Sequence, residues 1–422
     1  MKEDFLHYVW TYQKFSTLDL FTSNKEIVQI IKTGAHNFNA GPDFLHAQVI
    51  INELVWIGHV EVHINSSDWY AHHHEQDPQY DNVVLHVVWN HDTDVFRKDN
   101  TLIPTLELKE IVDINLINNY QNLLLAKNGI NCKNEIATID TFIISNWLDS
   151  LYLERLEQKS KFILNELINS NNNWEALLFT LLSKNFGLKV NGESFFSIAK
   201  SIPFSTLKKC SKNALELEAL LLGQAGLLEK DVNELYYFEL QRNYSFLKSK
   251  FKLSNSTVVK SIFFRLRPPN FPTIRLSQLA VLYTLKQNLF SEIIHAKTLE
   301  EFYAIFLVTA NPYWDMHYNF KVTSKKRKKG ITKKFVDLLL INTIIPLKYC
   351  YTKYLGKDIS EEIIELVTSI SKEGNITIKE FEGYKVEVKN SLESQAIIQL
   401  KNEYCIKNRC LHCAIGFQLL KR

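Results

Sequence analysis

The sequence has no long apolar run, no export signal and little net charge, and each absence excludes a class of protein. The apolar stretch at 338–345 is interrupted by Asn342 and is too short to cross a membrane. The first residues, Met1 to Asp4, lack the basic and then apolar pattern of an export signal. The 49 basic and 46 acidic residues leave a net charge of +3, so a polyanionic partner would have to bind a local patch.

Cysteine is also scarce, and its use is typical of a reducing compartment. Six cysteines without an export signal predict reduced thiols, a cytoplasmic location and no membrane partner. The length of 422 residues, 46% of them hydrophobic, is enough for two or three domains with sizeable cores. We find no repeat of fixed period, which argues against a solenoid.

The pattern of apolar residues divides the chain into a strand-rich part and a helical part. Residues 3–13 predict a short helix. Strands are predicted at 26–31, 47–52, 54–64, 82–89 and 103–108. After about residue 140, apolar residues recur at helical spacing and glycine and proline become sparse. We therefore expect an α+β chain, with a mixed α/β domain over 1–120 and a helical domain over 135–422.

Two carboxylates in the strand-rich part have the arrangement that a divalent-metal site needs. Asp43 follows a Gly-Pro turn, and Glu61 lies in the polar half of an alternating strand. Oxygen ligands on neighbouring strands can share one hard cation, so we expect Asp43 and Glu61 to hold Mg²⁺ or Mn²⁺. His63 points to the same face as Glu61 and can assist the attacking water or contact a phosphate. The simpler interpretation is a turn aspartate and a salt-bridged strand glutamate.

The same strand offers a second metal set. His59, Glu61 and His63 alternate on one face and can ligate Zn²⁺. Alternate strand residues lie about 7 Å apart, so His59 and His63 are too distant to share a compact site easily. His86, in the next predicted strand, is expected to be a buried core histidine.

A histidine-rich segment follows this strand. Ten of the thirteen histidines lie within residues 7–91, and three of them are consecutive at 72–74. We expect a loop over the site, with His72 or His74 near a phosphate and Trp69 stacked on a base. The alternative is an exposed polar loop that Trp69 anchors.

The helical part contains two clusters of basic residues. Segment 321–334 holds eight basic residues and no acidic one, which indicates either a polyanion-binding patch or a solvated loop. The residues expected to contact nucleic acid there are Lys325, Lys326, Arg327, Lys328 and Lys329. Segment 265–275 is dense in arginine and proline, and its arginines suit either phosphate or helix C-termini and buried carboxylates, the second being favoured.

Three cysteines lie close together near the end of the sequence. Cys405, Cys410 and Cys413 can hold Zn²⁺ or an iron–sulfur cluster. The candidates for a fourth ligand are Cys132, Cys350 and His412. The alternative is three ordinary reduced thiols, with Cys410 and Cys413 on one buried helix face.

The order of elements in the first part resembles the PD-(D/E)xK restriction-endonuclease-like fold. Over about residues 1–110, a helix, a strand, Pro-Asp, a strand with Glu-x-polar and a hydrophobic strand follow in turn, with His63 in place of the usual lysine. The resemblance implies metal-dependent hydrolysis of phosphodiester bonds in DNA or RNA. The alternative is a non-catalytic nucleic-acid-binding or scaffold protein that has kept the fold. Some nucleases of this fold carry a C-terminal cysteine cluster that staples the chain through one distant cysteine.

Longer strings resemble the bacterial DUF2851 family, whose function is unknown. They are Ala40-Gly41-Pro42-Asp43-Phe44, Val60-Glu61-Val62-His63, Ser66-Ser67-Asp68-Trp69, Arg267-Pro268-Pro269-Asn270-Phe271-Pro272 and the segment 404–416. Because these strings are spread over nearly the whole chain, the resemblance implies one architecture for both parts and no particular activity.

Overall fold

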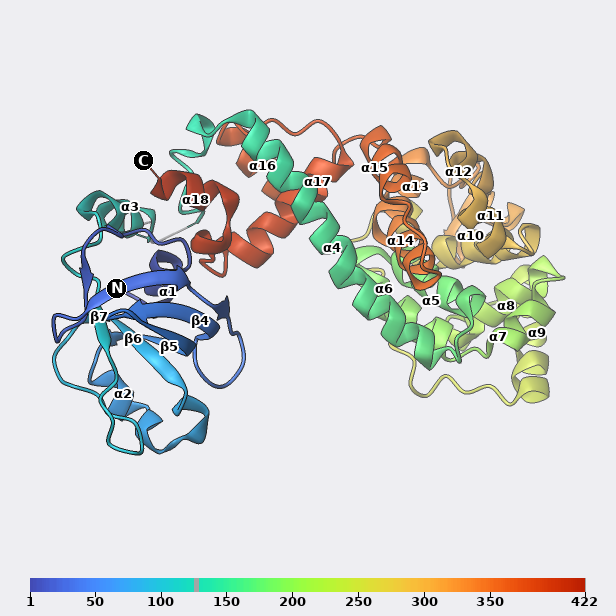
Figure 1. Cartoon of the computed structure of the whole chain (residues 1–422). Coiled ribbons are helices and arrows are strands. Elements are labelled where there is room, and N and C mark those ends of the chain that lie inside the picture. The colour runs from blue at the N-terminus through green and yellow to red at the C-terminus, as the bar shows by residue number, and fades with distance from the viewer. Residues whose placement is uncertain (125–128, 422) are drawn as a thin grey trace. The chain divides into compact units, whose positions relative to one another are not determined.

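The computed structural model describes residues 1–124 and 129–421, and its fold is α+β, as predicted (Figure 1). The chain forms two compact units. The first unit comprises Met1–Trp147, Glu380–Val386 and Gln399–Arg422. The second unit comprises Leu148–Lys379 and Glu387–Ile398. The expected division at residues 120–135 therefore differs from the observed one, because the chain returns to the first unit near its C-terminal end.

One mixed sheet forms the centre of the first unit. Its strands are β1 (Leu20–Phe21), β2 (Ile27–Lys32), β3 (Ala35–His36), β4 (Phe44–Ile51), β5 (Leu54–Asn65), β6 (Val83–Asn90) and β7 (Thr105–Glu107). They are ordered β1-β2-β4-β5-β6-β7, with β3 also paired to β4. The pairs β2–β4 and β4–β5 are antiparallel, whereas β5–β6 and β6–β7 are parallel. Each of the five predicted strands is present.

The parallel pair β5–β6 needs a crossover, and the histidine-rich segment provides it. This segment contains the short helix α2 (Asp68–Ala71) and the 3₁₀ turns His74–Gln76 and Pro78–Tyr80. Strand β6 is buried along most of its length, as its apolar sequence predicts for a central strand. Helix α1 (Glu3–Thr11) packs against β5 through its apolar side. The ends of β5 and the crossover therefore lie next to α1.

The segments that return to the first unit pack on its helices. Helix α18 (Ala414–Leu420) contacts α3 (Ile114–Leu124). The ring of Phe417 lies 5.8 Å from that of Tyr8 and 5.1 Å from that of Tyr12 on α1. These apolar contacts explain why the C-terminal segment belongs with the sheet.

The remainder of the chain is mainly helical. The helices are α4 (Thr141–Asn169), α5 (Trp174–Phe186), α6 (Leu188–Lys200), α7 (Phe204–Cys210), α8 (Ala214–Gln224), α9 (Leu235–Phe251), α10 (Pro272–Leu285), α11 (Leu289–His295), α12 (Leu299–Ile305), α13 (Lys333–Leu339), α14 (Ile345–Tyr354), α15 (Ser360–Ser369), α16 (Ile376–Gly383) and α17 (Ser391–Gln399). The hairpin β8 (His317–Asn319) and β9 (Val322–Thr323) precedes α13.

One helical stretch has the length and composition of a membrane span. It runs over Lys333–Tyr354, because a π-helical segment at Leu340–Ile344 joins α13 to α14 across Asn342. The sequence analysis treated this run as too short, since it took Asn342 as an interruption. Within its apolar window, 67% of the helix is buried inside the protein, which is typical of a core helix in a soluble protein.

Candidate functional site

Strands β4 and β5 bring the two predicted carboxylates together. The backbone N–H of Asp43 donates to Glu61 Oε2 at 3.1 Å, and the backbone N–H of Val62 donates to Asp43 Oδ2 at 3.0 Å. The turn before Asp43 depends on Gly41, whose φ of +97° is a conformation that L-residues rarely adopt. The carboxyl groups are thus cross-linked to each other's backbone where the two antiparallel strands meet.

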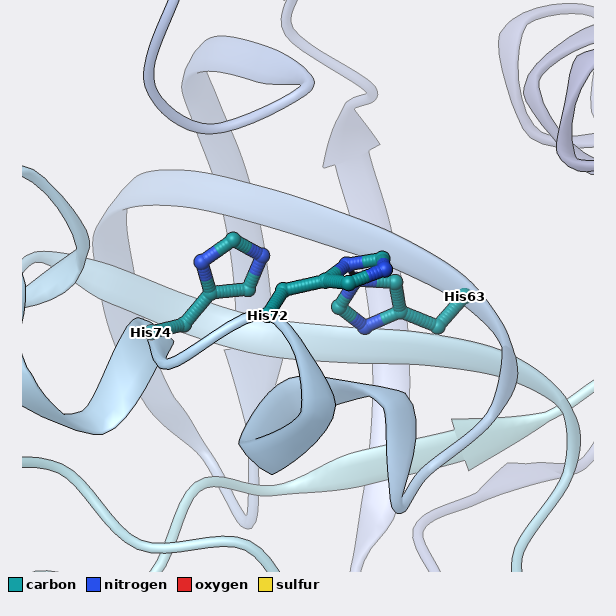
Figure 2. Close-up of side chains that lie close together, drawn as sticks. All are labelled: His63, His72 and His74. Carbon is teal, nitrogen blue, oxygen red and sulfur yellow. Dashed lines mark hydrogen bonds between the residues drawn. The ribbon is translucent and has the colours of Figure 1, made fainter.

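Three histidines surround the buried carboxyl group of Glu61, which is only 4% exposed. Glu61 Oε1 lies 3.2 Å from His74 Nε2 and 3.5 Å from His63 Nε2. His63 Nε2 is also 3.1 Å from His72 Nδ1. One ligand nitrogen from each of His63, His72 and His74 lies within 4.8 Å of the others, as Figure 2 illustrates. These nitrogens and the Glu61 oxygen form a donor set for a metal ion.

His86 supports this group from the adjacent strand. It is fully buried on β6, opposite Glu61 in the strand register, and its Nε2 lies 2.9 Å from His63 Nδ1. This contact occupies one ring nitrogen of His63 and leaves Nε2 toward Glu61 and His72. An outer hydrogen-bond partner of this kind orients a metal-ligating histidine. His86 is therefore buried, as predicted, and also positions a site residue.

Helix α1 contributes residues that the sequence analysis did not select. His7 Nε2 lies 3.2 Å from Asp43 Oδ2. The carboxyl of Glu3, one helical turn earlier, interacts electrostatically with Asp43 and His72. Their spacing of four residues places them on one helix face, and this was the available signal.

Burial and like charges strongly perturb the titration of these groups. Burial, followed by the negative charge of Asp43, raises the pKa of Glu61 to about 9. Burial, followed by the charges of His74 and His72, lowers the pKa of His63 to about 3. Burial opposes a charge on His7, but its hydrogen bond to Asp43 outweighs this and raises its pKa. Without a cation, Glu61 is held protonated and His63 neutral, whereas a bound cation would favour the ionised carboxylate.

Comparison with known proteins adds a family to this geometry. Residues 3–376 match the model of a protein family of unknown function, DUF2851. The chain belongs to the DUF2851 family. The match includes the whole carboxylate and histidine site and ends before the C-terminal cysteines. No curated protein and no solved structure matches the chain, so the comparisons neither support nor exclude the nuclease-like resemblance.

In this DUF2851 protein, Trp69 does not face the site. Its side chain is 1% exposed and packs in a cluster with Tyr80, Val83, Val95 and Ile103. The indole N–H donates to the backbone carbonyl of Phe96 at 3.2 Å. The indole is therefore enclosed and cannot stack on a base, and the alternative in which Trp69 anchors the loop fits its position.

The zinc set that includes His59 is not assembled in this DUF2851 protein. His59 Nδ1 accepts from the backbone N–H of His46 at 3.4 Å, and the two rings lie 5.8 Å apart. His63 instead joins the two histidines of the crossover. The cause is the strand spacing, because His59 and His63 are four residues apart on one extended strand.

The basic segment of the second unit is mostly exposed, as expected for either a polyanion-binding patch or a solvated loop. Lys325, Lys326, Arg327 and Lys328 are all exposed. Lys329 differs, because it is 5% exposed and its Nζ donates to the carbonyl of Asp315 at 2.9 Å. Lys329 is therefore committed to an internal contact and does not offer its charge to an extended nucleic-acid backbone.

Four cysteines of the first unit line one small cavity. They are Cys132, Cys405, Cys410 and Cys413. Burial, followed by mutual repulsion, raises the pKa of Cys132 to about 12. Cys350 lies in the second unit, where its thiol contacts the carbonyl of Ser160. Of the candidates for a fourth ligand, the structure thus places Cys132 with the C-terminal three.

The interpretation with Cys410 and Cys413 on one helix face does not fit. Cys410 begins a 3₁₀ turn, and Cys413 is the residue that precedes α18. Between them, Leu411 and His412 line a separate cavity of about 230 Å³ with His7 and two other helix and strand residues, among them His36. The cysteine-bearing loop therefore forms part of the wall next to the partner of Asp43.

Proposed function

We propose that this DUF2851 protein is a metal-dependent phosphodiesterase of the nuclease class, acting on DNA or RNA. The observation that carries the proposal is the reciprocal hydrogen bonding of Asp43 and Glu61 beside three imidazoles. The order of α1, the Pro-Asp turn, the Glu61 strand and the parallel strand β6 also resembles the PD-(D/E)xK order. A bound divalent ion would polarise the phosphate and lower the pKa of a water molecule.

The donor chemistry favours one metal over another. Glu61 Oε1, His63 Nε2 and His74 Nε2 converge within 3.5 Å of the carboxyl oxygen. Magnesium prefers oxygen ligands alone, whereas manganese and zinc accept imidazole. Of the two ions expected for this site, Mn²⁺ therefore fits these residues better than Mg²⁺, and Zn²⁺ is the competitor.

The residues divide their roles by burial. His63 is held neutral and buried, so we assign it to ligation rather than to proton transfer near neutral pH. His72 is the exposed member of the three histidines and is positioned to exchange a proton with solvent. Asp43, with His7 bound to it, keeps a negative charge beside the metal position.

Activity assays test this assignment. Purified protein is incubated with single- and double-stranded DNA and RNA in Mn²⁺, Mg²⁺, Zn²⁺ or chelator. We expect cleavage with Mn²⁺ and a loss of about 100-fold or more in Asp43→Asn and Glu61→Gln, because each removes a charge at the metal position. His72→Asn should reduce the rate and His73→Asn should not, since His73 is exposed and outside the three-histidine group.

The outcome also separates the competing function. Equal cleavage by the wild type, Asp43→Asn and Glu61→Gln would remove the proposed site. Nucleic-acid binding without cleavage under every metal would favour the non-catalytic binding or scaffold protein instead. We place this reaction in the cytoplasm, since the six cysteines are free thiols rather than disulfides.

We also infer a structural metal centre at Cys132, Cys405, Cys410 and Cys413. Four sulfurs of one zinc site lie about 3.8 Å apart, from tetrahedral geometry and a Zn–S distance of about 2.3 Å. Among the described residues, the three histidines form the only group of three or more potential ligands within 4.8 Å of one another. The wider sulfur spacing favours an iron–sulfur cluster over one zinc ion. Visible absorption and elemental analysis of the purified protein distinguish iron from zinc.

A further inference from the structure

The arginine–proline segment and the basic segment line one cavity in the second unit. This cavity has a volume of about 410 Å³ and lies at the start of α10 and α13. The cationic residues that line it are Arg267, Arg275, Arg327, Lys328, Lys329 and Lys334. Of the described residues that line the cavity, none is an aspartate or glutamate. Such an excess of one charge in a concave site attracts an anion.

Arg275 is the most informative residue of this cavity. It lies in the first turn of α10 and is 7% exposed. Its Nη1 donates to Gln278 Oε1 at 2.9 Å and its Nη2 donates to Asn270 Oδ1 at 2.7 Å. Both partners are neutral amides, and Nε has no hydrogen-bond partner in the part of the chain that the structure describes. A buried guanidinium is usually paired with a carboxylate, so its charge lacks the expected compensation.

The surroundings hold Arg275 in place without neutralising it. The guanidinium carbon lies 3.6 Å from the centroid of the Phe335 ring on α13. Gln278, which accepts from Arg275, donates to the carbonyl of Lys329 at 2.9 Å and so fixes the basic segment against α10. The favoured expectation of a helix C-terminus or a buried carboxylate is therefore wrong for this arginine, which begins a helix and contacts amides.

We propose that this cavity binds a phosphate monoester group, with Arg275 as the buried contact and Arg267 and Lys334 as exposed contacts. A guanidinium presents parallel donors that match phosphate oxygens. The positive end of α10, a helix of fourteen residues, adds to the attraction. A terminal phosphate carries up to two charges and only one substituent, so it can enter a concave site. An internal phosphodiester has one charge and two substituents, and it fits an open surface better.

This site is separate from the proposed phosphodiesterase site, and its occupancy does not depend on hydrolysis. The cavity volume lies within the range of about 300–1,000 Å³ that small-molecule sites occupy. Phosphate alone is smaller than this, so we expect a phosphorylated ligand of nucleotide size or the phosphorylated end of a nucleic-acid strand.

Titration calorimetry on the full chain tests the proposal with four probes. These are inorganic phosphate, a nucleoside 5′-monophosphate, and one oligonucleotide with and without a 5′-phosphate. We expect the nucleotide to bind more tightly than phosphate, and the phosphorylated oligonucleotide to bind at least tenfold more tightly than the unphosphorylated one. Equal affinity for the two oligonucleotides, or no binding of phosphate and nucleotide, would overturn the proposal.

Matched variants locate the binding in this cavity. Arg267→Gln and Lys334→Gln should each weaken nucleotide binding about tenfold, because each removes one charged contact. Arg265→Gln and Lys333→Gln remove the same charges from exposed neighbours that do not line the cavity, and they should bind as the wild type does. Unchanged affinity in the first pair, or equal losses in both pairs, would overturn the proposal.

Arg275→Gln provides the remaining variant, which should abolish binding. Circular dichroism and a thermal melt establish whether this variant is folded. A folded Arg275→Gln protein with the affinity of the wild type would overturn the proposal, and if the variant fails to fold, the exposed pairs decide.

Discussion

Replacing Glu61 with glutamine is expected to stabilise the metal-free first unit and to abolish metal binding there. Glu61 is buried, and its neighbours His63 and His74 are imidazoles rather than fixed cations. Glutamine keeps a carbonyl oxygen for the backbone N–H of Asp43 and adds an amide donor for a neutral His74. The variant therefore preserves the hydrogen bonds and removes only the titrating charge.

The magnitude follows from the pKa of Glu61, which is raised from 4.5 to about 9. Between these values the folded state keeps a proton that the unfolded state has released, so this group's contribution to stability falls as pH rises. Each pH unit in this window lowers the unfolding free energy by about 1.4 kcal/mol, which amounts to about 3 kcal/mol at pH 7. Glu61→Gln does not titrate, so its advantage over the wild type should grow with pH.

The assay must report on the first unit alone. Hydrogen exchange of peptides from β5 and β6, measured in urea between pH 5 and 8 with chelator, gives the local unfolding free energy. The exposed turn variant Glu53→Gln is the control and should follow the wild type at every pH. Parallel curves for the wild type and Glu61→Gln would refute the reasoning, because they would mean that Glu61 titrates alike in both states.

Three further predictions concern metals and nucleic acid. Adding Mn²⁺ at pH 7 should release about one proton per ion from the wild type and none from Glu61→Gln, as a pH indicator in weak buffer would detect. Cys132→Ser should lose most of the bound iron or zinc in elemental analysis, whereas Cys350→Ser should retain it; equal retention would exclude Cys132 as a ligand. The double variant Lys325→Glu, Lys326→Glu should weaken binding of every nucleic-acid sequence and reduce its salt dependence by about two contacts. An unchanged salt dependence would assign these lysines to a solvated loop.

The sheet could be predicted from the sequence because its signals are local. Apolar and polar residues alternate from Leu54 to Ile64, and β5 spans nearly the same residues. The continuous apolar run at 82–89 became the buried strand β6. The proximity of Asp43 and Glu61 was predictable for the same reason, since they lie on two strands joined by a tight hairpin.

The rest of the site depends on contacts between distant residues, which no period reveals. His7 reaches Asp43 from another element, and Cys132 joins cysteines about 270 positions later only because the chain returns to the first unit. Trp69 shows a different limit, because an aromatic residue in a polar segment can face solvent or the core, and its sequence neighbours do not distinguish these. Packing decided its position, since the indole completes an apolar cluster beneath the loop.

The two units each retain a buried charge that a protein selected for stability alone would not keep. In the first unit, Glu61 is buried beside neutral imidazoles, and its carboxylate form is strongly disfavoured. In the second unit, burial lowers the pKa of Arg275 to about 10, and its hydrogen bonds go to amides. An apolar or amide side chain would remove either penalty. The sign of each charge identifies what would compensate it, a cation at Glu61 and an anion at Arg275. A protein that handles phosphate groups with the help of a metal ion has a use for both.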